Sequence, residues 1–151
     1  LNADGSKLYV ANVGGDSVSV INTATRKVEA TLSTKPDPAL PWGTLTDGLA
    51  LSADGKTLYT ANAGVNAIGC IDLTQPAFPT RFIPSGWYPG AVRTAGPALF
   101  VANVRNGLQR VELPTTPAAV AALDDAALVF ERAFHLHRLR KHRRAVRRAA
   151  R

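Results

Sequence analysis

Histidine and cysteine, which carry much enzyme chemistry, are few in this 151-residue chain, and the histidines lie far in sequence from the cysteine. All three histidines, His135, His137 and His142, lie near the C-terminus, and Cys70 is the only cysteine. A single cysteine excludes an internal disulfide and a cysteine-based metal cluster. The sequence contains no Gly-x-Ser-x-Gly nucleophile motif and no glycine-rich phosphate loop before a helix. We therefore predict no catalytic residue and no cofactor.

The spacing of the histidines does not fit a metal site either. His135 and His137 would point to opposite faces of a strand, or lie about 200° apart on a helix. His142 does not complete a convincing zinc triad, and no carboxylate is well placed beside it. We predict no metal ligand. Cys70 occupies an apolar strand position, so we interpret it as a buried structural thiol rather than a reactive one.

Aromatic side chains offer a different chemistry, because a ligand can stack on an exposed ring. Trp42, Trp87 and Tyr88 fall in two segments that connect one group of predicted strands to the next. Trp87 and Tyr88 have two interpretations: they stack on a ligand, or they pack between neighbouring sheets. Trp42 lies in a proline-rich insertion, where exposure is favoured. These three residues are the predicted ligand-binding candidates.

The positive charge of the chain is concentrated at its C-terminal end. Residues 131–151 contain nine Lys and Arg and one Glu, whereas residues 1–130 contain nine Lys and Arg and ten acids. Clustered cations bind nucleic acids and anionic lipids. The candidate contacts in this tail are Arg138, Arg140, Lys141, Arg143 and Arg144. The alternatives are a solvated tail, or a segment that is not native coding sequence.

A repeat defines the rest of the chain. Leu58-Tyr59-Thr60-Ala61-Asn62 has a counterpart 50 residues earlier at Leu8–Asn12 and another 41 residues later at Leu99–Asn103. In the first two copies an Asp-Gly turn precedes the motif, and a glycine-bearing turn and a second alternating strand follow it. Each period holds four short strands, which is typical of a β-propeller blade.

The third copy is less regular. We align Trp87–Val92 with Thr46–Leu51, and we expect Gln109 and Glu112 to replace Ile68 and Ile71, and Val111 to match Cys70. The first period exceeds the second by nine residues, located between Leu32 and Thr46. Several prolines in that insertion exclude helix and inner strand, so it is predicted to be a surface loop.

These patterns predict an all-β fold, an incomplete β-propeller of about two and a half four-stranded blades. The expected propeller covers residues 1–114, in units of about 1–45, 46–86 and 87–114. Thr116 and Pro117 begin a predicted helix over 115–134, followed by the basic tail at 135–151. No window is apolar enough to span a membrane, and no leader is visible in the sequence.

The Asp-Gly turn, Tyr9-Val10-Ala11-Asn12 and Ser17–Asn22 resemble the YVTN-type β-propeller repeat of bacterial and archaeal surface and periplasmic proteins. The segment Ile83–Pro89 is similar to the propeller that precedes an alkaline-phosphatase-like phosphoesterase domain in some bacterial proteins. The resemblance implies an extracytoplasmic location and a ring of about seven blades. Because an incomplete ring leaves blade faces unpaired, we expect this chain alone to dimerise or aggregate.

We interpret the chain as a non-catalytic scaffold or binding module, part of a larger extracytoplasmic protein. Its partners would be an unidentified ligand or protein at the propeller face and the remaining blades of the parent. The alternative is the propeller half of a bifunctional phosphoesterase whose catalytic domain is absent here. A second alternative is nucleic-acid or anionic-surface binding through the Arg-rich tail.

Overall fold

The computed structural model describes residues 1–39 and 43–113, and these form short β-strands joined by turns. The predicted all-β class is confirmed, whereas the predicted helix at 115–134 and the tail at 135–151 lie outside the described residues. No helix among the described residues is long and apolar enough to cross a membrane. The strands are β1 (Lys7–Asn12), β2 (Ser17–Asn22), β3 (Lys27–Ser33), β4 (Thr46–Leu51), β5 (Thr57–Asn62), β6 (Ala67–Asp72), β7 (Thr80–Pro84), β8 (Pro89–Ala95), β9 (Ala98–Asn103) and β10 (Gly107–Glu112).

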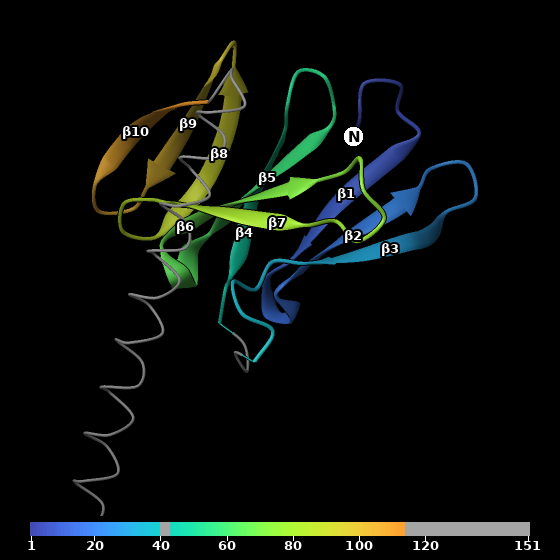
Figure 1. Ribbon diagram of the computed structural model, residues 1–151, viewed down its shortest axis with the longest axis horizontal. Coiled ribbons are helices and arrows are strands. Elements are labelled where there is room, and N and C mark those ends of the chain that lie inside the picture. The colour runs from blue at the N-terminus through green and yellow to red at the C-terminus, as the bar shows by residue number, and fades with distance from the viewer. Residues whose placement is uncertain (40–42, 114–151) are drawn as a thin grey trace, which may run out of the picture.

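The strands form three antiparallel sheets that lie side by side in chain order (Figure 1). Sheet 1 has the order β1-β2-β3, sheet 2 the order β4-β5-β6-β7, and sheet 3 the order β10-β9-β8. The first strand of sheet 2, β4, packs against both β1 and β8. Sheet 2 is therefore flanked on both faces, and each outer sheet has a neighbour on one face within the described residues.

The repeat accounts for the strand pattern. Strands β1, β2 and β3 correspond to β5, β6 and β7, with the same antiparallel register in the first two: Asn12 lies opposite Ser17, and Asn62 opposite Ala67. The Asp54 side chain accepts a hydrogen bond from the Lys56 amide at 3.1 Å, and Gly55 has a φ of 71°. This conformation is one that glycine adopts at little cost, which explains the Asp-Gly turn.

The register corrects the predicted alignment of the third copy. Thr46 and Pro89 both start their strands, opposite Asn62 and Asn103, so Pro89 and not Trp87 is the counterpart of Thr46. The hairpin between β8 and β9 is two residues shorter than the one between β4 and β5, which hides this shift in the sequence.

A second correction concerns β10. The turn before β10 is one residue shorter than the turn before β6, so Leu108 matches Ile68 and Gln109 matches Gly69. In this register Arg110 is the counterpart of Cys70, and Val111 is the counterpart of Ile71. The two isoleucine positions of β6 therefore carry apolar residues in β10 as well, contrary to the predicted alignment.

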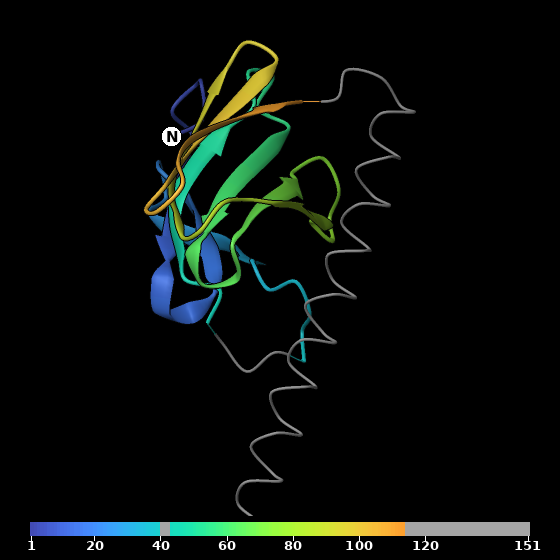
Figure 2. The same cartoon turned by 90° about the vertical axis from the view of Figure 1, so that its left-hand side faces the viewer.

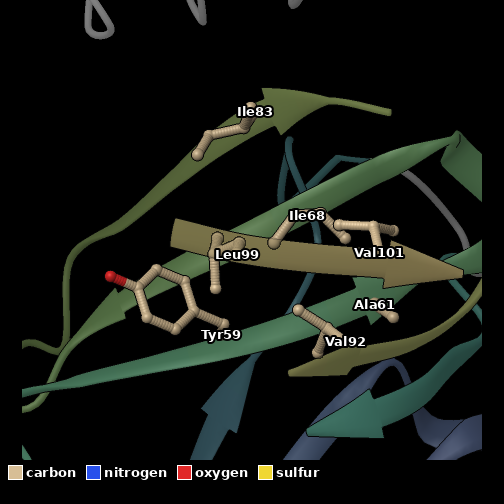
Figure 3. Packing of buried hydrophobic residues seen from close by; sticks show 7 residues of the cluster. All are labelled: Tyr59, Ala61, Ile68, Ile83, Val92, Leu99 and Val101. Carbon is tan, nitrogen blue, oxygen red and sulfur yellow. The ribbon is translucent and has the colours of Figure 1, made fainter. Parts of the chain in front are cut away.

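Two apolar cores hold the three sheets together. Between sheets 1 and 2 the buried residues are Val18, Val20, Leu32, Leu58 and Ile71. Between sheets 2 and 3 they are Tyr59, Ala61, Ile68, Ile83, Val92, Leu99 and Val101 (Figure 3). Each face of sheet 2 supplies one core, because successive residues of a strand point to opposite faces.

Candidate functional site

One end of the three sheets collects the turns and connections that carry the candidate site residues. We call it the connection end; it comprises turns 13–16, 63–66 and 104–106, the described parts of connection 34–45, and connection 85–88. The short 3-10 segments Val13–Gly15 and Ala63–Val65 mark this end at the bottom of Figure 1, and the hairpin tip of β4 and β5 lies at the opposite end. Figure 2 shows both 3-10 segments at the same end after a 90° turn.

Asp16 holds the first connection against sheet 1. Its carboxylate accepts hydrogen bonds from the backbone amides of Gly43 (2.7 Å), Thr44 (2.8 Å) and Leu45 (3.2 Å). Asp16 itself is 2% exposed and adopts a left-handed conformation. A carboxylate with three amide donors is strongly bound, because hydrogen bonds to an ionised acceptor exceed neutral ones in strength.

A buried row of polar side chains continues from this connection into sheet 2. The Thr46 hydroxyl donates to Asn62 Oδ1 at 2.9 Å and lies 2.7 Å from the Thr34 hydroxyl. Among the described residues, two atoms of this row have no hydrogen-bond partner, Thr60 Oγ1 and Asn62 Nδ2. In sheet 1 the equivalent Asn12 amide donates to the hydroxyls of Ser17 (3.2 Å) and Ser19 (2.9 Å).

The second connection carries Trp87 and Tyr88, and neutral side chains hold its backbone. The Trp87 amide donates to Asn106 Oδ1 at 2.7 Å, and the Tyr88 amide donates to Asn66 Oδ1 at 2.8 Å. The Gly86 amide donates to Gln109 Oε1 at 3.1 Å. Side chains from sheets 2 and 3 thus fix three consecutive amides, which orients the two aromatic residues.

Trp87 is 54% exposed and Tyr88 is 38% exposed, so neither residue is buried between the sheets among the described residues. The Arg105 guanidinium carbon lies 5.6 Å from the centre of the Trp87 ring, within the range of a cation–π contact. The described site therefore places a flat apolar ring beside a positive charge. Trp42, the third candidate, lies outside the described residues.

Tyr88 also has an unusual backbone conformation, with a φ of 56°. Leu45, which precedes β4 as Tyr88 precedes β8, has a φ of 51°. A positive φ disfavours side chains with a Cβ. The shared conformation indicates that both connections enter their strands by the same path, so the position of Tyr88 is set by the repeat.

Asp4, Asp54 and Cys70, whose pKa values are shifted, lie outside the turns and connections of this end. Cys70 is partly buried beside the core between sheets 2 and 3, and burial raises the pKa of its thiol to about 12. This agrees with the predicted structural thiol, because the thiolate is the reactive form. Hydrogen bonds from Ser6 lower the pKa of Asp4, and those from Ser52 and Lys56 lower the pKa of Asp54.

Within residues 1–39 and 43–113, no group of three His, Cys, Asp or Glu side chains has the geometry to hold a metal ion. The candidate tail contacts from Arg138 to Arg144 lie outside the described residues. Sequence reasoning missed the residues that position the site, Asp16, Asn66, Asn106 and Gln109, and it missed Arg105. The available signal was the place of Asp16 and Asn66 at the same repeat position, where a left-handed conformation suits Asp and Asn.

Comparison with known proteins shows the fold. No family model and no curated protein matches the chain. Hydrazine synthase of Kuenenia stuttgartiensis is 23% identical with a TM-score of 0.62, over 72% of this chain and 30% of that one. A 6-phosphogluconolactonase candidate of Bacteroides fragilis is 21% identical with a TM-score of 0.62, over 74% and 33%. The β-propeller domain of Cps50 (Swd1) of Myceliophteria thermophila is 16% identical with a TM-score of 0.54, over 82% and 41%.

The chain has a β-propeller fold, as these similarities and the three antiparallel sheets show. The predicted incomplete propeller is thereby confirmed as a fold class. The chain spans between 30% and 41% of the length of these three structures. Identities this low indicate shared architecture, and propellers support many unrelated functions.

Proposed function

We propose that this chain is a non-catalytic, YVTN-type β-propeller module that works outside the cytoplasm and binds a ligand on its connection end. The observation that carries the proposal is the exposed Trp87 ring beside Arg105, on a backbone fixed by Asn66, Asn106 and Gln109. Exposed tryptophan on a fixed backbone suits binding, because little conformational entropy is lost when a ligand arrives.

The chemistry of the two side chains indicates a ligand class. The Trp87 ring offers an apolar face for stacking, and Arg105 offers N–H donors and a positive charge at the edge of that ring. Together they suit a ring that carries a carboxylate, such as an acidic sugar. Catalysis is not part of this proposal.

A fluorescence titration tests the proposal. The chain has two tryptophans, so Trp42→Phe leaves Trp87 as the only reporter. We expect oligogalacturonate to shift Trp87 emission and a neutral galacto-oligosaccharide of equal length to shift it less. Arg105→Gln should remove the difference between the two, whereas Val104→Ala, at a neighbouring exposed position, should not. Equal, negligible responses to both sugars would contradict the proposed ligand class.

The alternative is that the chain is the propeller half of a phosphoesterase. Its support is the resemblance of Ile83–Pro89, the segment that ends β7, carries Trp87 and Tyr88, and begins β8. The open reading frame that follows this segment in the parent gene is the deciding observation. A downstream domain rich in metal ligands, with phosphatase activity on p-nitrophenyl phosphate, would favour the enzyme. For tail binding, a truncation after Phe130 that left salt-sensitive DNA binding unchanged would exclude the tail.

A further inference from the structure

The two interfaces between sheets are formed in the same way, with one face of a sheet packed against the opposite face of the next sheet. Each sheet has a leading face, directed toward the preceding sheet, and a trailing face, directed toward the next. The trailing face of sheet 1, with Val18 and Val20, packs against Leu58 on the leading face of sheet 2. The trailing face of sheet 2, with Tyr59 and Ile68, packs against Leu99 and Val101 on the leading face of sheet 3.

Sheet 1 carries the same leading face with nothing packed on it in the described structure. Leu8 and Val10 are the repeat counterparts of Leu58 and Thr60. Leu8 and Val10 are each 37% exposed, whereas Leu58 is 1% exposed and Thr60 is fully buried. The same strand positions that form an interface in sheet 2 therefore face solvent in sheet 1.

Sheet 3 carries the complementary open face. In the observed register Phe100 and Leu108 are the counterparts of Tyr59 and Ile68. Leu108 is 71% exposed, whereas Ile68 is fully buried between sheets 2 and 3. Arg110, the counterpart of Cys70, lies on the same face, which therefore combines apolar and basic side chains. An exposed large apolar side chain such as Leu108 favours an interaction surface.

We propose that the trailing face of sheet 3 binds the leading face of sheet 1 of a second copy of this chain. We choose a second copy because its sheet 1 offers a leading face. Within the chain, leading faces already cover the trailing faces of sheets 1 and 2. The contact between the two copies would be equivalent to the contacts between sheets 1 and 2 and between sheets 2 and 3. It is heterologous, with different surfaces meeting, so repeated contacts close into a ring when the rotation per copy allows it.

The test uses two variants of the full chain, each with one face blocked by a charge. Val10→Asp blocks the leading face of sheet 1, and Leu108→Asp blocks the trailing face of sheet 3. We expect the wild-type chain to form species of at least twice the monomer mass, measured by light scattering at high ionic strength, which screens the basic tail. Each variant alone should be monomeric. An equimolar mixture should form a heterodimer and nothing larger, because one intact pair of faces remains.

Controls make each outcome decisive. Val104→Asp, at a residue 70% exposed on the connection end, should associate like the wild type. Circular dichroism confirms that each variant is folded; if Val10→Asp is not, Leu8→Lys replaces it on the same face. A monomeric wild type, a mixture that stays monomeric, or a Leu108→Asp variant that dimerises alone through two leading faces would overturn the proposal. Binding of oligogalacturonate at Trp87 is measured separately, so the two proposals fail independently.

Discussion

The hairpins β1-β2 and β5-β6 have the same strand register and occupy the same repeat positions, but their environments differ. Leu8 and Leu58 hold the same repeat position, but Leu8 is 37% exposed and Leu58 is 1% exposed. Asn12 donates to two serine hydroxyls, whereas the amide nitrogen of Asn62 is buried without a partner among the described residues. The comparison teaches that the repeat determines strand, turn and register, and that neighbouring sheets determine what each position contributes to stability.

The largest expected difference between the hairpins is at their leucines. We expect Leu58→Ala to lower the free energy of unfolding by about 4 kcal/mol, because it leaves a cavity in the core between sheets 1 and 2. Leu8→Ala should cost less than about 1 kcal/mol, since its side chain is partly in water. Urea unfolding in a Leu108→Asp background, which our proposal predicts to be monomeric, measures both. Equal losses would show that exposure does not separate the two hairpins.

The glycines of the two turns provide the next comparison. A Cβ at Gly64 would overlap the Gly43 carbonyl oxygen, whereas a Cβ at Gly14, the equivalent position in sheet 1, has no described atom within 4 Å. We expect Gly64→Ala to destabilise by about 3 kcal/mol, because the first connection must move. Gly14→Ala should be neutral or slightly stabilising, since alanine restricts the unfolded chain. Thermal melting of both variants measures the two changes in stability. A marked loss of stability in Gly14→Ala would contradict this account.

The residues that hold the two connections differ in charge. The Asp16 carboxylate accepts from three backbone amides, whereas the Asn66 side chain accepts, among the described residues, from the Tyr88 amide alone. Both are in the left-handed conformation, so replacing either with alanine carries the same backbone cost. We therefore expect Asp16→Ala to cost about 2 kcal/mol more than Asn66→Ala. Chemical denaturation measures the free energy of unfolding of the two variants. The stability of Asp16→Asn should lie between theirs.

The sequence predicted the features that depend on near neighbours in the chain. The Asp54-Gly55 turn and the alternation in Thr57–Asn62 determine a hairpin without help from distant residues. The register of the third copy was predicted wrongly, because the turns on both sides of Leu99–Asn103 are shorter than their counterparts in sheet 2. The motif stays recognisable, whereas the strands before and after it are shifted. Residue identity alone does not reveal such a shift; the strand pairing does.

The candidate site was predicted in part for the same reason. Trp87 and Tyr88 were recognisable as connection residues, but their exposure depends on how sheets 2 and 3 pack. Arg105 reaches Trp87 from another turn, and Asp16 binds amides 27 to 29 residues away. Contacts between separate loops leave no periodic signal, so the residues that position the site become visible only in the folded chain.

The smallest expected effect distinguishes the cross-strand pair Tyr59 and Cys70 in sheet 2 from its counterpart Tyr9 and Val20 in sheet 1. Burial raises the pKa of Cys70 from 9.0 to about 12, and burial, followed by the neighbouring Cys70, raises that of Tyr59 from 10.0 to about 12. The folded state therefore holds these protons more tightly than the unfolded state. Stability is fully present below pH 9 and falls as the pH rises from 9 toward 12.

Replacing the cysteine with the residue of sheet 1 tests this difference. Cys70→Val removes the group with the lower unfolded pKa, so the alkaline loss of stability should begin near pH 10 instead of pH 9. Stability at pH 7 should change by less than about 1 kcal/mol, because valine fits the same strand position as Val20. Urea unfolding between pH 7 and pH 11 measures the onset. An onset that stays at pH 9 in the variant would show that a group other than Cys70 begins the alkaline loss.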